Sequence, residues 1–100
     1  MGSYVLTRAA RADLKQIGRY TTQHWGEEQA ETYLSALHIA LGDLAALPDM
    51  GRQVKWTGEG YLRFDTGRHA VFYRKRANHI LIVRVLHQSM EPKRHLPGAD

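Results

Sequence analysis

The hydrophobic pattern of this chain changes its period once, near residue 60, and this change constrains the fold more than any other feature. Before it, apolar residues recur every three or four positions, which is typical of amphipathic helices. After it, short runs rich in β-branched and aromatic residues are separated by turns, which is typical of strands. A chain of 100 residues with this order is long enough for one domain with a single modest core.

A short strand followed by a helix is predicted at the start of the chain. Residues 4–7 are β-branched or aromatic and alternate, and Thr7 can cap the helix that follows. That helix is expected over residues 8–24, and Gly26 ends it. Its mostly apolar stripe consists of Ala10, Leu14, Ile17 and Thr21.

A second helix is predicted from the next apolar stripe. Acidic residues crowd its first turns, where the helix dipole favours negative charge, and it stops at Leu47, before Pro48. Because only a glycine turn separates the two helices, they are expected to form an antiparallel hairpin. The stripe of the second helix consists of Ala30, Leu34, Leu37, Leu41 and Leu44.

The remaining chain predicts a loop, three strands and a tail. Residues 48–60 form the loop, with a brief extended piece at 53–56, and residues 88–100 form the tail. The resulting fold class is α+β, a two-layer sandwich of order βααβββ with the helical hairpin packed on a mostly antiparallel four-stranded sheet. The three later strands are expected at residues 61–64, 69–74 and 80–87.

Charge is distributed unevenly along the chain. Residues 51–100 carry ten Lys and Arg against four acids, whereas the first half carries four bases against six acids. This asymmetry predicts a basic, sheet-built surface for an acidic or phosphate-rich partner, with a near-neutral helical layer behind it. The absence of cysteine and of any apolar run of membrane-spanning length predicts a soluble protein of the cytoplasm, with no membrane partner.

The sequence offers no pattern for a cofactor. Its six histidines lack the close spacing of metal ligands, and no glycine loop has the context that cradles phosphate, so neither a metal nor a nucleotide is expected. What remains is a set of strand-borne bases and one histidine. Strict alternation predicts that Arg84 and His87 point to opposite faces unless a bulge intervenes, and Arg84 needs either a structural ion-pair partner or a phosphate or partner contact. The set consists of Arg63, Arg74, Arg84 and His87, with Lys55 upstream and Lys93 and Arg94 downstream.

An ordered series of short motifs resembles the ParE branch of the ParE/RelE toxin superfamily over nearly the whole chain. The series begins with Tyr-x-Leu-Thr at residues 4–7 and ends with Arg-Val-Leu-His at 84–87; Tyr-Leu-Arg and Val-Phe-Tyr-Arg lie between. The first helix contributes Ala10, Asp13, Leu14, Ile17 and Tyr20.

The resemblance implies the toxin half of a type II toxin–antitoxin module with a βααβββ fold. A small ParD-like antitoxin would neutralise the chain in a hetero-oligomer, and the target would be DNA gyrase, inhibited by protein contact without a catalytic site of the toxin's own. The antitoxin is expected to place apolar anchors in the groove between the helical hairpin and the sheet edge. Candidate antitoxin-binding residues are Leu14, Ile17, Tyr20, Tyr33, Leu37, Leu41 and Arg74. Candidate target-binding residues are Lys55, Trp56, Arg63, Arg74, Arg84, His87, Lys93 and Arg94.

Two alternatives stay open. A ribosome-dependent mRNA endonuclease of the RelE branch would use Arg63 and Arg84 on the developing phosphate charge and His87 for proton transfer. The chain departs from that pattern, since no tyrosine follows His87 and Lys55 is the one lysine of its loop. The third hypothesis is a basic nucleic-acid-binding module without sequence-specific DNA binding, although the sheet lacks the stacked aromatic residues of single-strand binders.

Overall fold

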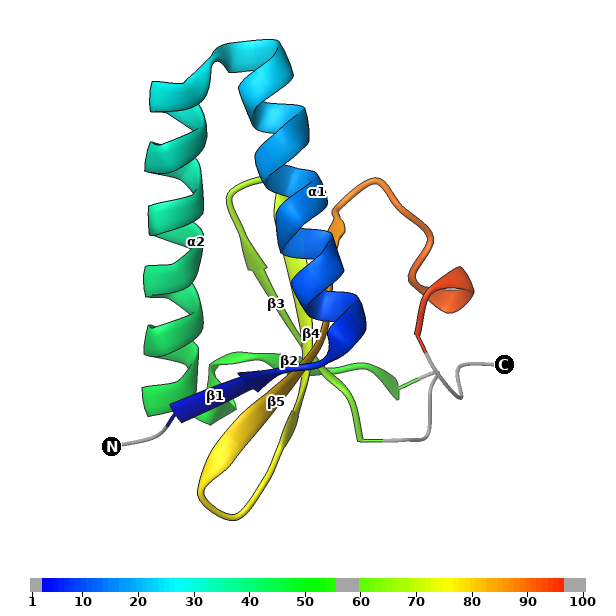
Figure 1. Ribbon diagram of the computed structural model, residues 1–100. Coiled ribbons are helices and arrows are strands. Elements are labelled where there is room, and N and C mark those ends of the chain that lie inside the picture. The colour runs from blue at the N-terminus through cyan, green and yellow to red at the C-terminus, as the bar shows by residue number, and fades with distance from the viewer. Residues whose placement is uncertain (1–2, 56–59, 97–100) are drawn as a thin grey trace.

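The computed structural model describes residues 3–55 and 60–96, and it places two helices against one side of a mixed five-stranded sheet (Figure 1). Strand β1 lies at one edge, parallel to β5, and the other pairs are antiparallel in the order β1-β5-β4-β3-β2. The helices are α1 (Arg8–Trp25) and α2 (Glu27–Ala46), with short 3₁₀ turns η1 (Pro48–Met50) and η3 (Pro92–Arg94). The strands are β1 (Ser3–Leu6), β2 (Arg52–Gln53), β3 (Leu62–Thr66), β4 (His69–Lys75) and β5 (His79–His87).

The helical hairpin has the predicted start and turn. The Oγ1 atom of Thr7 accepts a hydrogen bond of 3.0 Å from the backbone N–H of Ala10, which satisfies one free donor at the start of α1. Gly26 ends the helix at φ 91°, a backbone conformation that side chains with a Cβ rarely adopt. The α+β class is confirmed. Neither helix among the described residues has an apolar stretch long enough to cross a bilayer.

The sheet has one strand more than the four predicted. The extra strand β2 comes from residues 48–60, predicted as a loop with an extended piece at 53–56; the strand begins earlier, at Arg52. It pairs with β3 through Arg52 opposite Arg63 and Gln53 opposite Leu62. A strand of two residues has no hydrophobic alternation to reveal it, so the prediction missed it for lack of signal.

A register shift in β5 changes which face its last residues occupy. Phe72 of β4 lies opposite Arg84, but the next residue, Tyr73, lies opposite Ile82, so β5 contains one residue more over this interval. Val85 therefore packs with Ile80 and Ile82 on the helix side, whereas strict alternation predicted it on the other face. The prediction held only for a strand without a bulge, and the bulge reverses the faces beyond it.

The sheet has a core on each face. The larger core lies between the sheet and the helices, and its members include Leu37, Leu41 and Tyr73. The smaller core, on the opposite face, contains Phe72 and Leu86, with Leu96 of the C-terminal segment packed into it. In Figure 1 this orange and red segment runs to the right of α1. The outer face of the sheet is therefore partly covered by the chain's own end and is not an open basic surface.

Thr7 and Asp13, at the start of α1, form hydrogen bonds with the edge of β5 beyond the end of β1. Strand β1 pairs with β5 only as far as Ile82, which leaves the next residues at a free edge. Thr7 then donates its backbone N–H to the carbonyl of Ile82 and its hydroxyl to that of Val83, at 3.0 and 2.7 Å. The Oδ2 atom of Asp13 accepts the N–H of Val85 at 2.9 Å. These side-chain and backbone groups satisfy the sheet edge that would otherwise lack partners.

Gly42 lies on the exposed side of α2, and a Cβ added there would meet no atom within 4 Å. Replacing Gly42 by alanine is expected to raise the free energy of unfolding by about 0.5–1 kcal/mol, because alanine loses less backbone freedom in a helix. Urea denaturation of both proteins measures this difference. Gly18→Ala is the control, since its Cβ would lie 3.2 Å from Leu34 and the gain should be smaller or absent. Equal gains in the two variants would contradict the packing described for the hairpin.

Candidate functional site

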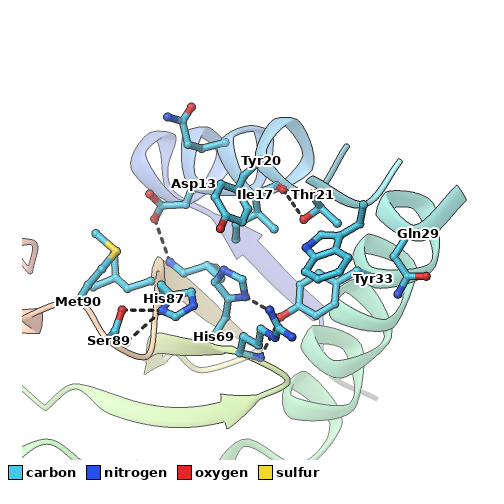
Figure 2. Close-up of a pocket in the computed structure, with 15 residues that line it drawn as sticks. Asp13, Ile17, Tyr20, Thr21, Gln29, Tyr33, His69, His87, Ser89 and Met90 are labelled. Carbon is cyan, nitrogen blue, oxygen red and sulfur yellow. Dashed lines mark hydrogen bonds between the residues drawn. The ribbon is translucent and has the colours of Figure 1, made fainter. Parts of the chain in front are cut away.

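A pocket of about 650 Å³ opens between the helical hairpin and the ends of β4 and β5 (Figure 2). Ile17 and Tyr20 face it from α1 and Tyr33 from α2, while Ser89 and Met90 close it from the segment after β5. Val85 and Leu86 line it from the sheet. The pocket therefore lies between the hairpin and the sheet, at the ends of two inner strands, and the groove predicted for the antitoxin at the sheet edge stays a prediction.

Two histidines on neighbouring strands lie inside this pocket. His69 is opposite His87 in the β4–β5 ladder, and their ring centroids lie 5.5 Å apart in an edge-to-face arrangement. The hydroxyl of Tyr33 lies 2.6 Å from Nδ1 of His69, and the same oxygen accepts the backbone N–H of Arg68 at 3.1 Å. Because that oxygen already accepts a hydrogen bond from Arg68, its own hydrogen can point to Nδ1, and in this arrangement the proton of the neutral His69 ring is on Nε2.

His87 is held in the same tautomer by the chain that follows it. Its Nδ1 accepts the backbone N–H of Ser89 at 3.1 Å and lies 2.8 Å from the hydroxyl of Ser89 (Figure 2). An Nδ1 that accepts a backbone N–H carries no proton in the neutral ring, so Nε2 is again the donor. The pocket thus contains two imidazoles whose hydrogen-bond partners hold them as Nε2–H donors.

Gly67 sets the distance between the β3–β4 turn and α2. It has φ 55°, and a Cβ at this position would lie 2.7 Å from the hydroxyl oxygen of Tyr33. The turn can therefore approach Tyr33 closely only because residue 67 has no side chain. This approach brings the backbone N–H of Arg68 within hydrogen-bond distance of the Tyr33 hydroxyl. That hydroxyl is the group that contacts Nδ1 of His69.

The surroundings of His69 keep its ring neutral. Burial, with a smaller contribution from the neighbouring His87, lowers the pKa of His69 from 6.5 to about 4, against the opposing effect of the Asp13 carboxylate. In the unfolded chain this histidine binds a proton below pH 6.5, whereas in the fold it does so only near pH 4. The stability that depends on a neutral His69 is therefore complete above pH 6.5 and is lost as the pH falls toward 4.

The pH dependence of unfolding provides a test of this environment. A shift of this size is equivalent to about 3 kcal/mol for a fully buried group, and the partial exposure of the ring reduces it to about 1–2 kcal/mol. We expect the free energy of unfolding of the wild type to fall by this amount, relative to His69→Gln, between pH 7 and pH 4.5. His79→Gln, outside the pocket, is the control and should follow the wild type. Parallel curves for wild type and His69→Gln would exclude a shifted His69.

Aromatic side chains and one arginine surround the pocket mouth. Trp25 is 59% exposed, and the guanidinium of Arg68 lies 5.8 Å from the centre of its ring. Tyr20 is 58% exposed and stacks on His24 with ring centroids 4.0 Å apart. Large exposed aromatic side chains beside a concave site are typical anchors for a protein partner.

Beside the pocket, Asp13 and Arg84 form the best-connected ion pair in the described part of the chain. The Nε and Nη2 atoms of Arg84 donate to the two carboxylate oxygens of Asp13, both at 2.7 Å, and Nη1 donates to the carbonyl of His95 at 3.1 Å. The hydrogen bonds that Arg84 donates to Asp13 raise the pKa of Arg84 above its usual value. Of the two roles considered for Arg84, the structure shows the ion pair, and its partner is Asp13.

The three residues considered for RNA cleavage do not form one cluster. Arg63 faces the outer side of the sheet and donates to Asp65 at 2.8 Å. Burial alone would raise the pKa of Asp65, but the hydrogen bond and charge of Arg63 lower it below its usual value. His87 lies beyond the bulge and faces the pocket on the helix side. Asp65 thus forms an ion pair with Arg63, and Asp13 forms one with Arg84. His87 lies on the opposite face of the sheet from Arg63.

The other predicted target-binding residues lie on or near the outer side of the sheet. Arg74 stacks over the ring of Tyr61, with its guanidinium carbon 4.7 Å from the ring centre. Lys55 follows β2, and Lys93 and Arg94 belong to η3; all three are exposed. Trp56 lies outside the described residues.

The predicted antitoxin-binding residues divide between the core and the pocket. Leu14, Ile17, Leu37 and Leu41 are at most 8% exposed and hold the helices against the sheet, although Ile17 also reaches the pocket. Tyr20 and Tyr33 line the pocket, whereas Arg74 lies on the opposite side of the sheet. The apolar stripe that suggested these leucines is the stripe that the fold buries.

Sequence reasoning missed Asp13, Arg68 and His69 as parts of the site. For Asp13 a signal was present, because it lies three residues after Ala10 and four before Ile17, at the border of the buried stripe. A carboxylate at such a position needs a buried partner. Arg68 and His69 gave no comparable signal, since their position depends on the turn at Gly67 and on the bulge in β5.

The charges of the helical layer nearly cancel in sum, but they separate between the two helices. Helix α1 carries Arg8, Arg11, Lys15 and Arg19, and α2 carries the acidic residues of the hairpin other than Asp13. Three of these bases line a second, open groove between the helices, whose floor includes Leu6, Leu14 and Leu34.

Comparison with known proteins adds a family match over most of the chain. Residues 4–92 match the family described as ParE toxin of type II toxin–antitoxin system, parDE. The chain is 43% identical to Toxin ParE1 of Caulobacter vibrioides over 96 residues, covering 96% of this chain and 99% of that protein. It is 40% identical to Toxin ParE1 of Mycobacterium tuberculosis over 94 residues, covering 93% and 96% of the two chains.

Solved structures share the fold. A chain of the chromosomal ParDE toxin–antitoxin system from P. aeruginosa superposes with a TM-score of 0.72 at 21% identity, covering 87% of this chain and 96% of that one. A chain of the RelBE2 toxin–antitoxin complex from Mycobacterium tuberculosis gives a TM-score of 0.65 at 23% identity, covering 87% and 98%. At these identities the two structures support the fold alone.

Proposed function

Because the chain belongs to the family of ParE toxins of type II toxin–antitoxin systems, we propose that it inhibits DNA gyrase by direct contact and is neutralised by an antitoxin bound in the pocket. In this proposal the chain acts in the cytoplasm, blocks replication, and has no catalytic site of its own. Its inactive form is a hetero-oligomer with a ParD-like antitoxin.

The ion pairs of Arg63 and Arg84 are the observation that favours DNA gyrase over mRNA as the target. Cleavage of RNA needs cationic groups that are free to meet a developing phosphate charge, together with a proton-transfer group within reach. Arg84 is instead bound by both oxygens of Asp13, and Arg63 by Asp65. Freeing Arg84 would also leave the partly buried carboxylate of Asp13 without its counter-ion. These arginines therefore fit a structural role better than a catalytic one.

The target is proposed to dock on the side of the sheet that carries the C-terminal segment. Lys55, Lys93 and Arg94 are exposed there, and Arg74 lies over Tyr61 on the same side of the sheet. Exposed positive charge accelerates encounter with an acidic surface and fixes orientation. This arrangement leaves the pocket on the helix side available for the antitoxin.

The antitoxin is proposed to dock with an apolar segment in the pocket. Tyr20, Trp25 and Met90 give its mouth exposed apolar surface, and Ile17 and Val85 line it further in. An amphipathic segment that covers these side chains would remove them from water, which is the main favourable term in such interfaces.

A supercoiling assay with purified components tests the proposed activity. The purified chain is expected to inhibit supercoiling by DNA gyrase, and the antitoxin encoded by the neighbouring reading frame is expected to restore it. In a translating extract the same protein should leave messenger RNA intact. Full supercoiling at a large molar excess of the chain would overturn the proposed target, and messages cut in the extract would favour the endonuclease reading instead.

A further inference from the structure

The pocket that the proposed function assigns to the antitoxin contains more than apolar anchors. Its polar groups are Arg68 at the mouth, the paired His69 and His87 inside, and the hydroxyls of Tyr33 and Ser89 beside them. These groups come from separate parts of the chain and meet in one place. Their hydrogen-bonding state indicates which chemical group of a partner would complement them.

The histidines present donors to the pocket. Nδ1 of each ring is already engaged, by Tyr33 and by Ser89, so the proton of each neutral ring is on Nε2. Within residues 3–55 and 60–96, Nε2 of neither ring has a hydrogen-bond partner. No side-chain nitrogen in those ranges is both unpaired and fully buried, so Nε2 of His69 reaches solvent-accessible space.

The pocket also has an excess of positive charge. The guanidinium of Arg68 lies over Trp25 and forms no ion pair with any carboxylate among the described residues. The acid that faces His69 from α1 is Asp13, and Arg84 neutralises it. The other titratable groups around His69 are Tyr33 from α2, Tyr20 from α1 and His87 from β5. Among the residues that the structure describes, this cluster therefore contains no carboxylate without a counter-ion.

We propose that the antitoxin inserts a carboxylate side chain into this pocket beside Arg68 and His69, and that binding is coupled to the uptake of a proton by His69. The inference rests on the proposed function, since it names the group by which the antitoxin fills its site. A carboxylate meets two kinds of donor there, the Nε2–H of the imidazole and the guanidinium. Its negative charge also counteracts the burial that keeps His69 neutral, because an adjacent negative charge stabilises the imidazolium.

Proton uptake can be measured directly by calorimetry. The full-length chain is titrated with the purified antitoxin from the neighbouring reading frame at pH 6.5, in phosphate and in Tris buffer. The difference in binding enthalpy between buffers of different ionisation enthalpy gives the number of protons taken up. We expect about 0.5–1 proton for the wild type, and an affinity that rises about tenfold from pH 8 to pH 6.

Three variants separate this inference from general effects on folding. His69→Gln keeps an acceptor for Tyr33 and should bind with no proton uptake, whereas His79→Gln, outside the pocket, should match the wild type. Arg68→Gln alters an exposed side chain, so the fold should be retained, and it should weaken binding about tenfold while uptake remains. Tight binding of the wild type with equal enthalpies in both buffers would overturn the inference and leave the proposed function standing. No binding by the wild type would overturn both.

Discussion

Replacing Asp13 by alanine is expected to lower the free energy of unfolding by about 3–4 kcal/mol, because it leaves a partly buried guanidinium without its carboxylate. The substitution also removes the acceptor of the Val85 N–H at the edge of β5. Arg84 and Asp13 are 20% and 13% exposed in their side chains, so water can replace these contacts only in part. Chemical denaturation monitored by circular dichroism measures the loss.

Asp43→Ala is the matched control for this prediction. Asp43 lies on the exposed side of α2 and forms no ion pair among the described residues, so its removal should change the free energy of unfolding by less than about 0.5 kcal/mol. The double variant Asp13→Ala with Arg84→Met should be less destabilised than the sum of the two single variants, since the methionine no longer needs a carboxylate. Additive losses would contradict a direct ion pair between Asp13 and Arg84.

Replacing Phe72 by alanine is expected to destabilise the protein by about 3–5 kcal/mol, the range for a fully buried aromatic side chain. Phe72 is 1% exposed although it lies on the face of the sheet away from the helices, because the segment that includes Leu96 covers it. Phe64→Ala is the control on the neighbouring strand, where the ring is only partly buried against the helix-side core, and it should cost less. Equal or smaller loss in the Phe72 variant would show that the C-terminal segment does not cover this face.

The elements with repeated hydrophobic patterns could be predicted from the sequence. Thr7 and Gly26 bound α1 because capping and a positive φ depend on local chemistry. The buried stripe from Ala10 to Thr21 followed from helical spacing alone. The three later strands were predicted within about two residues at each end because two turns separate their apolar runs.

The parts that the sequence could not predict depend on contacts between distant residues. Strand β2 has two residues and forms only by pairing with β3. The bulge in β5 moves Val85 and His87 to the helix side, and no local pattern marks its position. The pocket arises from this reversal together with the turn at Gly67. Charge counts suggested an open basic sheet, but Leu96 and the Asp13–Arg84 pair show that the chain uses part of that face for its own stability.

The most direct test of the account is the concentration at which charge variants of the chain inhibit supercoiling by purified DNA gyrase. If the side of the sheet with the C-terminal segment docks the target, Lys93→Glu with Arg94→Glu should raise the half-inhibitory concentration at least about tenfold. Arg11→Glu with Lys15→Glu, which reverses two charges on α1, should leave it unchanged. The wild type and the α1 variant are expected to inhibit gyrase at equal concentrations. Equal inhibition by all three proteins, or none by the wild type, would contradict docking of gyrase on this side of the sheet.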